Sequence, residues 1–484
     1  MDARTRGRRA TIVVFMAALL APAIAVGLSP QLRESVAAVV ADPGDWPEQS
    51  NRLRAATPLW DGAVSAHATL LYELGASADE GVGVVGRDGW MFLGDVQNAN
   101  FYQALGRRQF SDEEIDAWSS VVTDQRTWLA NRGIPLVVAV APAKWSVYPD
   151  RLPAWTDEVR GPTVLDQVLA ARPDLGLVDL RPALRDARAT ADTYSRLNSH
   201  WTGFGGYVGW QSIADAVDHA LPGADARAPA LEGVRTVPDG VNEFDAMLGV
   251  RAPNPWTVAD LAEPLPDVQV VEDNGDLVTV PGDRETDLLD LPRTTRNAAA
   301  GNDLTVLVLR DSMGDAISPY LQAAFGTTVQ VRHSIDAPQD APNIQALVER
   351  VQPDLVLVEM AERHLNSGLP DREAWAAANA YDRAQDGPGA PVTVAGTLED
   401  GVELDVGADA AADLVLRVAL DAQGSGSLRI TGPDGTVRDV RVARGANVLF
   451  ARVPSGPGEV PTRLALGEGS SSAELTSVDV RVAG

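Results

Sequence analysis

The 484-residue sequence contains no cysteine, which excludes disulfide bonds, cysteine-ligated zinc, thiol catalysis and a lipidated N-terminal cysteine. Positive charge is also scarce, because 40 lysine and arginine residues stand against 67 acidic ones. The resulting net charge of -27 argues against nucleic acid as a partner. The sequence also lacks a metal-ligand cluster and a glycine-rich phosphate loop. We therefore expect neither a metal nor a cofactor.

The first 30 residues form a predicted membrane anchor or signal segment. Four arginines between Arg4 and Arg9 precede an uncharged run from Ala10 to Leu28, which is long enough to cross a bilayer as a helix. The positive-inside rule then places Met1 in the cytoplasm and the remaining chain outside, as a single-pass membrane protein. The alternative is a secreted protein, cleaved after the small residues Ala23-Ile24-Ala25. The length of the apolar run favours the anchor, and both interpretations export the rest of the chain.

Alternating strand and helix patterns predict an α/β fold for residues 31–385. Apolar runs at 134–142, 177–180 and 306–309 alternate with amphipathic helical patterns, which is typical of a largely parallel sheet with helices on both faces. The segment 222–302 is rich in Pro, Asp and Gly, and we expect an irregular insertion there.

After a Gly/Pro-rich linker, residues 391–484 show short alternating strands, which predict an all-β sandwich. Appended sandwiches often bind carbohydrate. This segment contains a single aromatic residue, Phe450, whereas a sugar-binding face usually presents several. A spacer or packing module is therefore an equally good interpretation.

A serine after an apolar strand is the candidate nucleophile. The run 306–309 ends at Asp311-Ser312, and chemistry in open α/β sheets gathers beyond the carboxyl ends of the strands. A serine hydroxyl needs a neighbouring base, and the chain has five histidines. His200 lies in a loop before a predicted helix, with Asn198 two positions earlier as a possible orienting group. The alternatives are that Ser312 only caps the next helix and that His200 is a packing residue.

Other polar residues follow neighbouring predicted strands. Lys144 and Tyr148 come after the run 134–142, and Arg363 follows the run 355–360 together with Glu359, Glu362 and His364. Lys144, Tyr148 and Arg363 could bind substrate or stabilise a developing negative charge. The alternative for these positions is a solvated or ion-paired side chain.

Four motifs resemble, in order, those of the alginate O-acetyltransferase family. They are Gly89-Trp90-Met91-Phe92, Ala141-Pro142-Ala143-Lys144 with Tyr148-Pro149, Asn198-Ser199-His200-Trp201 and Arg310-Asp311-Ser312. The resemblance covers roughly residues 50 to 380. It implies an exported protein with an SGNH-hydrolase-like, flavodoxin-like sheet. It further implies acetyl transfer to hydroxyls of an extracellular or cell-envelope polysaccharide through a serine-acetyl intermediate, beside a membrane-bound partner that supplies acetyl groups.

The resemblance assigns Ser312 as nucleophile and His200 as base, with Asn198 at the position of the family's aspartate. Asparagine can accept a hydrogen bond from imidazole but carries no negative charge. Asp192 or Asp311 could compensate if the fold brought either one to His200. The backbone N–H of Ser312 and an adjacent loop amide are the expected oxyanion donors, with Asp311 and Met313 as further candidates.

Three functions follow from this sequence. The first is polysaccharide O-acetylation. The second is an acetyl or carbohydrate esterase that uses the same residues with water as acceptor. The third is a catalytically weak or inactive glycan-binding envelope protein, which the Asn198 substitution favours.

Overall fold

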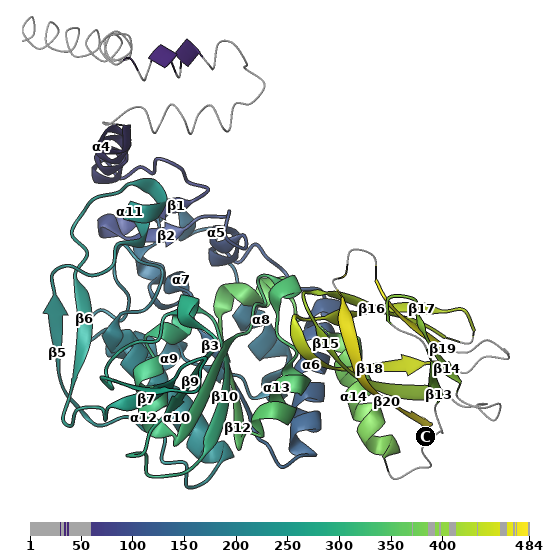
Figure 1. Cartoon of the computed structure of the whole chain (residues 1–484). Coiled ribbons are helices and arrows are strands. Elements are labelled where there is room, and N and C mark those ends of the chain that lie inside the picture. The colour runs from purple at the N-terminus through teal and green to yellow at the C-terminus, as the bar shows by residue number, and fades with distance from the viewer. Residues whose placement is uncertain are drawn as a thin grey trace, which may run out of the picture. The chain divides into compact units, whose positions relative to one another are not determined.

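The computed structural model is shown in Figure 1. It describes residues 30, 33–34, 36–37, 60–369, 371–385, 393–395, 398–405, 413–432, 434–454, 462–467, 470 and 472–482. The predicted anchor or signal run, 10–28, lies outside the described residues. Among the helices that are described, none has both the length and the apolar character needed to cross a membrane.

The described residues divide into two compact units. The smaller unit combines the part before Ala78 with Phe244–Ala252. Within it, helix α4 (Trp60–Glu73) is tied to the second segment by Thr69, whose Oγ1 accepts from the backbone N–H of Arg251 at 2.9 Å. The larger unit combines Asp79–Glu243 with Pro253–Gly484 and holds both the α/β fold and the C-terminal strands.

An eight-stranded mixed sheet forms the centre of the larger unit. Five neighbouring strands are parallel, and three further strands extend the sheet in antiparallel fashion. In spatial order the strands are β4 (Val178–Asp179), β3 (Leu136–Ala141), β12 (Leu355–Ala361), β10 (Thr305–Arg310), β11 (Thr327–Arg332), β9 (Arg293–Arg296), β7 (Val268–Val271) and β8 (Leu277–Val280). The predicted α/β class is confirmed, and β10, which precedes Ser312, is a central strand.

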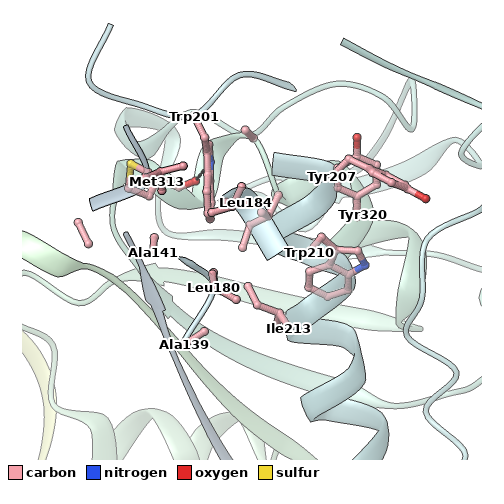
Figure 2. Packing of buried hydrophobic residues seen from close by; sticks show 14 of the residues in the cluster. Ala139, Ala141, Leu180, Leu184, Trp201, Tyr207, Trp210, Ile213, Met313 and Tyr320 are labelled. Atoms are coloured by element: carbon pink, nitrogen blue, oxygen red, sulfur yellow. Dashed lines mark hydrogen bonds between the residues drawn. The ribbon is translucent and has the colours of Figure 1, made fainter. Parts of the chain in front are cut away.

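Helices cover both faces of this sheet. Successive residues of a strand point to opposite faces, and because both sets are apolar here, both faces have to be buried. Val306 and Val308 of β10 face one core, and Leu307 and Leu309 face the other. Figure 2 shows the first core, where Trp210 of helix α10 packs over the sheet. The first face is covered by α9 (Arg181–Ala187), α10 (Gly203–Ala220) and α12 (Ser318–Ala324). The second is covered by α6 (Asp112–Ala130), α8 (Val164–Ala171), α13 (Ile344–Val351) and α14 (Arg372–Ala384).

The segment 222–302 is not irregular, so that expectation was wrong. It contributes the antiparallel extension of the main sheet and a separate two-stranded sheet of β5 (Leu231–Val237) and β6 (Trp256–Leu261). Its strands are short, and in β7 only alternate residues are buried, with Val268 and Val270 inside and Gln269 exposed. The strands β7 and β8 are only four residues long, and Pro, Asp and Gly fill the connections between them, which is why the composition resembles that of a loop.

Short elements complete the α/β part near the carboxyl ends of the strands. The motif Gly89-Trp90-Met91-Phe92 lies in a hairpin of β1 (Gly83–Val85) and β2 (Met91–Leu93), which pair in antiparallel register. Two short helices of this part are α5 (Asn100–Ala104) and α7 (Lys144–Val147). A third, α11 (Glu243–Leu248), begins at the last residue of the segment Asp79–Glu243 and otherwise belongs to the smaller unit.

The C-terminal strands form two antiparallel sheets with a common apolar core. One sheet has the order β13 (Thr393–Ala395), β14 (Val402–Asp405), β19 (Thr462–Leu466), β16 (Gly426–Thr431), β17 (Val437–Val442). The other has the order β18 (Gly445–Val453), β15 (Leu414–Ala422), β20 (Ala473–Val482). The predicted sandwich architecture is therefore confirmed, whereas the domain boundaries stay predictions.

The α/β part and the sandwich share a packed contact. Val415, Val448 and Phe450 belong to the same apolar cluster as helix α14. The Phe450 ring lies 5.4 Å from the ring of Tyr381 and is buried. The single aromatic residue of 391–484 therefore packs against the α/β part rather than facing solvent.

Candidate active site

Ser312 lies at the carboxyl end of the central strand β10, in a short helical turn, Ser312–Asp315. With Asp311 included, we call residues 311–315 the Ser312 turn. Asp311 caps this turn, because its Oδ1 accepts from the backbone N–H of Met313 at 2.9 Å. The Ser312 hydroxyl is therefore not needed as a cap, and it is partly exposed. Ser312 is the first residue of the helical turn, but the side chain that caps the turn is that of Asp311.

His200 lies in a loop between α9 and α10, and residues 193–202 are here called the His200 loop. Its Nε2 lies 2.8 Å from the Ser312 Oγ. The loop is held to the Ser312 turn by Trp201, whose Nε1 donates to the Met313 carbonyl at 2.8 Å (Figure 2). At its end Thr202 caps α10, accepting from the backbone N–H of Gly205. The structure therefore brings together two segments that lie 112 residues apart.

Asn198 completes a continuous hydrogen-bonded chain. Its Oδ1 lies 2.9 Å from Nδ1 of His200 and also accepts from the His200 backbone N–H at 2.9 Å. Its Nδ2 donates to the Val241 carbonyl at 3.1 Å. Because this second bond requires the amide nitrogen to face Val241, the amide oxygen faces the imidazole. The arrangement selects the tautomer with hydrogen on Nδ1, which leaves Nε2 free to accept from Ser312.

Lys144 is hydrogen-bonded to the backbone of the His200 loop. Its Nζ donates to the carbonyls of Ser195, Arg196 and Asn198 at 3.0, 2.9 and 2.9 Å. The side chain is buried, and Nζ lies 5.3 Å from the centre of the Trp90 ring. Burial lowers the pKa of Lys144 to about 7. Lys144 therefore acts on the loop that carries His200, through the backbone.

The remaining predicted site residues differ in position. Tyr148 is buried and stacks on Trp90, with its hydroxyl accepting from the backbone N–H of Thr193 at 2.8 Å. Met313 is buried, and its N–H and carbonyl are both occupied. Arg363 lines a small cleft of about 300 Å³, including space open to solvent, together with Lys144, Ser199 and Met313. Ser199 and Met313 are the sequence neighbours of His200 and Ser312, so the cleft reaches both segments of the reactive pair.

Asp311 faces away from His200 into a buried cluster. Its Oδ2 lies 2.8 Å from Nδ1 of His364 and 3.4 Å from Nε2 of His333, and it accepts from the Ala361 backbone N–H at 2.7 Å. These hydrogen bonds hold the pKa of Asp311 well below its usual range, although burial acts in the opposite direction. Among the described residues, neither Asp311 nor Asp192 is hydrogen-bonded to His200, and Oδ1 of Asp192 instead lies 3.4 Å from the Tyr148 hydroxyl.

The same cluster contains the ligand types of a metal site. The ligand atoms of Asp311, His333 and His364 lie within 4.8 Å of one another, and all three residues are buried. However, two backbone N–H groups already donate to this carboxylate, and the 2.8 Å contact with His364 is a hydrogen-bonding distance. In these close polar contacts His333 Nε2 and His364 Nδ1 form no well-aligned hydrogen bond within the part of the chain that the structure describes. The expected absence of a metal stays a prediction.

Sequence reasoning missed Glu243, which lies beside the hydrogen-bonded chain. Its Oε2 accepts from the Ser199 backbone N–H at 2.7 Å and lies 4.0 Å from Nδ1 of His200. Burial lowers the pKa of His200, and among the nearby charges Glu243 raises it. Glu243 comes from the segment predicted to be irregular, and no motif marks it in the sequence.

Comparisons with known proteins identify a family and related folds for this chain. Residues 84–351 match the family described as SGNH hydrolase-like domain, acetyltransferase AlgX. Two curated relatives carry the description probable alginate O-acetylase AlgJ. The Pseudomonas putida protein is 28% identical over 162 residues, and the Pseudomonas aeruginosa protein is 31% identical over 154 residues. These alignments cover 32% and 31% of this chain, but only 39% and 35% of the relatives' own lengths.

Among solved structures, Pseudomonas aeruginosa AlgX has a similar fold. The TM-score is 0.50 at 14% sequence identity, and the match covers 83% of this chain and 94% of that chain. At this identity the likeness supports the fold alone. It extends over the α/β part and into the C-terminal region, because a match of that length exceeds the α/β part.

Proposed function

Because this chain belongs to the SGNH hydrolase-like AlgX acetyltransferase domain family, we propose that it is an O-acetyltransferase acting on polysaccharide hydroxyls outside the cytoplasm. The observation that carries the proposal is the chain Ser312 Oγ, His200 Nε2, His200 Nδ1, Asn198 Oδ1, with links of 2.8 and 2.9 Å. A hydroxyl within hydrogen-bond reach of an oriented imidazole is the arrangement that acyl transfer requires. The curated relatives, described as probable alginate O-acetylases, support the choice of a polysaccharide acceptor.

In the first step Ser312 becomes acetylated. His200 Nε2 takes the hydroxyl proton while Oγ forms a bond to the acetyl carbonyl carbon. The bond between that carbon and the donor's leaving group then breaks, and the leaving group departs with the proton from His200. The Ser312 backbone N–H is the proposed oxyanion donor, because the N–H of Met313 already donates to Asp311.

In the second step a sugar hydroxyl takes the acetyl group. His200 removes the proton of that hydroxyl, its oxygen bonds to the acetyl carbon, and the ester bond to Ser312 breaks with return of a proton to Oγ. The cleft of about 300 Å³ beside Met313 and Arg363 lies at the lower end of the usual volume range of ligand pockets, which suits a short acyl group. The acetyl donor in this proposal is a membrane-bound acyltransferase.

Two alternatives share the same residues. An esterase would use water in the second step, and the geometry of Ser312 and His200 serves either acceptor. The inactive, glycan-binding alternative rests on Asn198, and the 2.9 Å contact between its Oδ1 and His200 argues against it. The buried position of Phe450 removes the one aromatic platform that a sugar-binding sandwich could have offered.

The proposal is tested with a chromogenic acetyl ester as donor and an oligosaccharide as acceptor. The wild-type protein should form an acetyl adduct on Ser312, detectable by peptide mass spectrometry, and should transfer it to the oligosaccharide faster than to water. Ser312→Ala should abolish both the adduct and the transfer, while the far-UV circular dichroism spectrum stays unchanged. Hydrolysis without transfer would support the esterase, and a folded wild-type protein without an adduct would contradict both enzymatic functions.

A further inference from the structure

The hydrogen-bonded chain lacks a negative charge at the position where imidazolium would form. When His200 accepts the Ser312 proton, the ring becomes positively charged, and Asn198 can offer only an amide dipole. In serine proteases, replacement of the aspartate by asparagine costs about 10⁴ in turnover. An enzyme with Asn198 therefore needs either a lower rate or another nearby carboxylate.

Glu243 supplies such a carboxylate on the same side of the ring. Its Oε2 lies 4.0 Å from Nδ1 of His200, the nitrogen that faces Asn198. The two side chains are only 21% and 27% exposed, so water screens their interaction less than at an open surface. At this separation the contact is electrostatic rather than a hydrogen bond.

We propose that Glu243 is a positioning residue that stabilises the His200 imidazolium through space, so that orientation by Asn198 and charge from Glu243 together replace a single aspartate. This inference rests on the proposed function, because it concerns the base of that reaction. Under this proposal the Glu243 side chain is part of the active site.

The backbone around Glu243 holds the carboxylate at this distance. The Glu243 N–H donates to the Leu197 carbonyl at 2.9 Å, and Leu197 N–H donates to Asn254 Oδ1 at 3.0 Å. Asn254 Nδ2 donates to the Val241 carbonyl, which also accepts from Asn198. Residues 241–243 are thus bonded to Leu197 and Asn198 within the His200 loop, and the Ser199 N–H donates to Oε2 of Glu243 itself.

The other charged residues near His200, Arg363 and Asp311, do not take the place of the Glu243 carboxylate. Arg363 opposes protonation of the ring and lowers its pKa. Asp311 favours protonation, but its carboxylate already accepts from Met313 and Ala361 within the buried cluster. Glu243 also raises the pKa of Lys144 against the effect of burial, so its charge supports the loop as well.

The test measures the reactivity of Ser312 toward phenylmethylsulfonyl fluoride, which does not depend on any sugar acceptor. Ser312 Oγ bonds to sulfur, fluoride leaves, and the proton passes to His200. The rate of adduct formation is followed by intact mass spectrometry from pH 5 to 9. Wild type, Glu243→Gln, Asn198→Asp and the double variant are compared, with Glu232→Gln, an exposed glutamate on β5, as matched control.

Glu243→Gln should lower the plateau rate about tenfold and move the acidic limb of the pH profile to lower pH by about one unit. The shift has this sign because loss of the carboxylate lowers the pKa of His200, so the neutral base persists to lower pH. In the Asn198→Asp background the same substitution should cost less than about threefold, since aspartate already supplies the charge. Glu232→Gln should behave as wild type.

Equal losses in both backgrounds, or a reduced plateau with an unmoved acidic limb, would overturn the role of Glu243. Glu243→Asp, which keeps the charge, should retain more activity than Glu243→Gln, and the reverse order would also overturn it. If folded wild-type protein forms no Ser312 adduct at any pH, the proposed function itself fails and this inference with it. An adduct that forms at the same rate in wild type and Glu243→Gln overturns this inference alone.

Discussion

Two histidine sites contact neighbouring residues of the Ser312 turn, and they differ in burial and in the group that each histidine meets. His200 is 27% exposed and faces the neutral amide of Asn198, with Glu243 further away. His333 and His364 are each 3% exposed and face the Asp311 carboxylate directly. The residue pair that resembles a strong catalytic dyad is therefore the buried one, which cannot reach substrate.

The adjacent residues Asp311 and Ser312 therefore have different roles, because Asp311 holds the turn in place and Ser312 is the proposed nucleophile. The Asp311 carboxylate accepts from two backbone N–H groups, and its ionised form is held by the histidines that contact it. It fixes the Ser312 turn to the end of β12 through Ala361. The exposed site instead keeps one hydroxyl and one imidazole nitrogen available. A carboxylate next to a nucleophilic serine in sequence thus need not be the carboxylate that assists it.

Breaking the exposed site should have the largest effect on activity. His200→Ala removes the proposed base and should lower acetyl transfer about 10⁴-fold. The unfolding midpoint in urea should change little, because the ring is partly exposed and packs weakly. The matched control is His219→Ala, an exposed histidine on α10, which should retain wild-type transfer. A loss of less than about tenfold for His200→Ala would contradict the proposed base.

Breaking the buried site should act on stability first. Asp311→Asn leaves His333 and His364 without their acidic partner and should lower the free energy of unfolding by about 3 kcal/mol. Since the pKa of Asp311 is depressed in the folded protein, its contribution is present above about pH 4 and is lost as the pH falls further. Urea unfolding at several pH values should therefore show a flatter acid dependence in the variant.

The control for that variant is Asp303→Asn, an exposed aspartate before β10, which should keep wild-type stability and acid dependence. If Asp311→Asn were as stable as wild type but lacked activity, Asp311 would belong to the reaction rather than to the support of the turn.

Removing the hydrogen bonds between Lys144 and the His200 loop should have the smallest effect of the three changes. Lys144→Met removes the donor of three carbonyls and should cost about 2 kcal/mol, with transfer reduced about tenfold. The pKa of Lys144 is about 7 in the folded protein against 10.5 ordinarily, so between these values the unfolded chain binds more protons. In this range the stability of the wild-type protein should rise with pH through this group, and the variant should lack that rise.

Because Lys144 is the single lysine, the control is the exposed Arg107→Met, which should preserve both stability and its pH dependence. A variant at Lys144 with unchanged stability and full transfer would show that the loop holds its shape without this side chain.

Local patterns in the sequence were sufficient for the parallel core of the fold. Apolar runs buried on both faces, such as 306–309, and capping signals, such as the box between Ser111 and Glu114, produce strands and helices wherever they occur. The strands β7 and β8 are only four residues long and lie among polar connections, so the segment that contains them resembled a loop.

By itself the sequence determined the two ends of the reactive pair, because Ser312 follows a buried strand and His200 lies in a loop before a helix. The tertiary structure alone decided which carboxylate meets which histidine. Glu243 approaches His200 from 43 residues away, and Lys144 reaches carbonyls more than 50 residues distant. Such contacts depend on how helices and loops pack over the sheet, and that packing is not encoded in the spacing of any local motif.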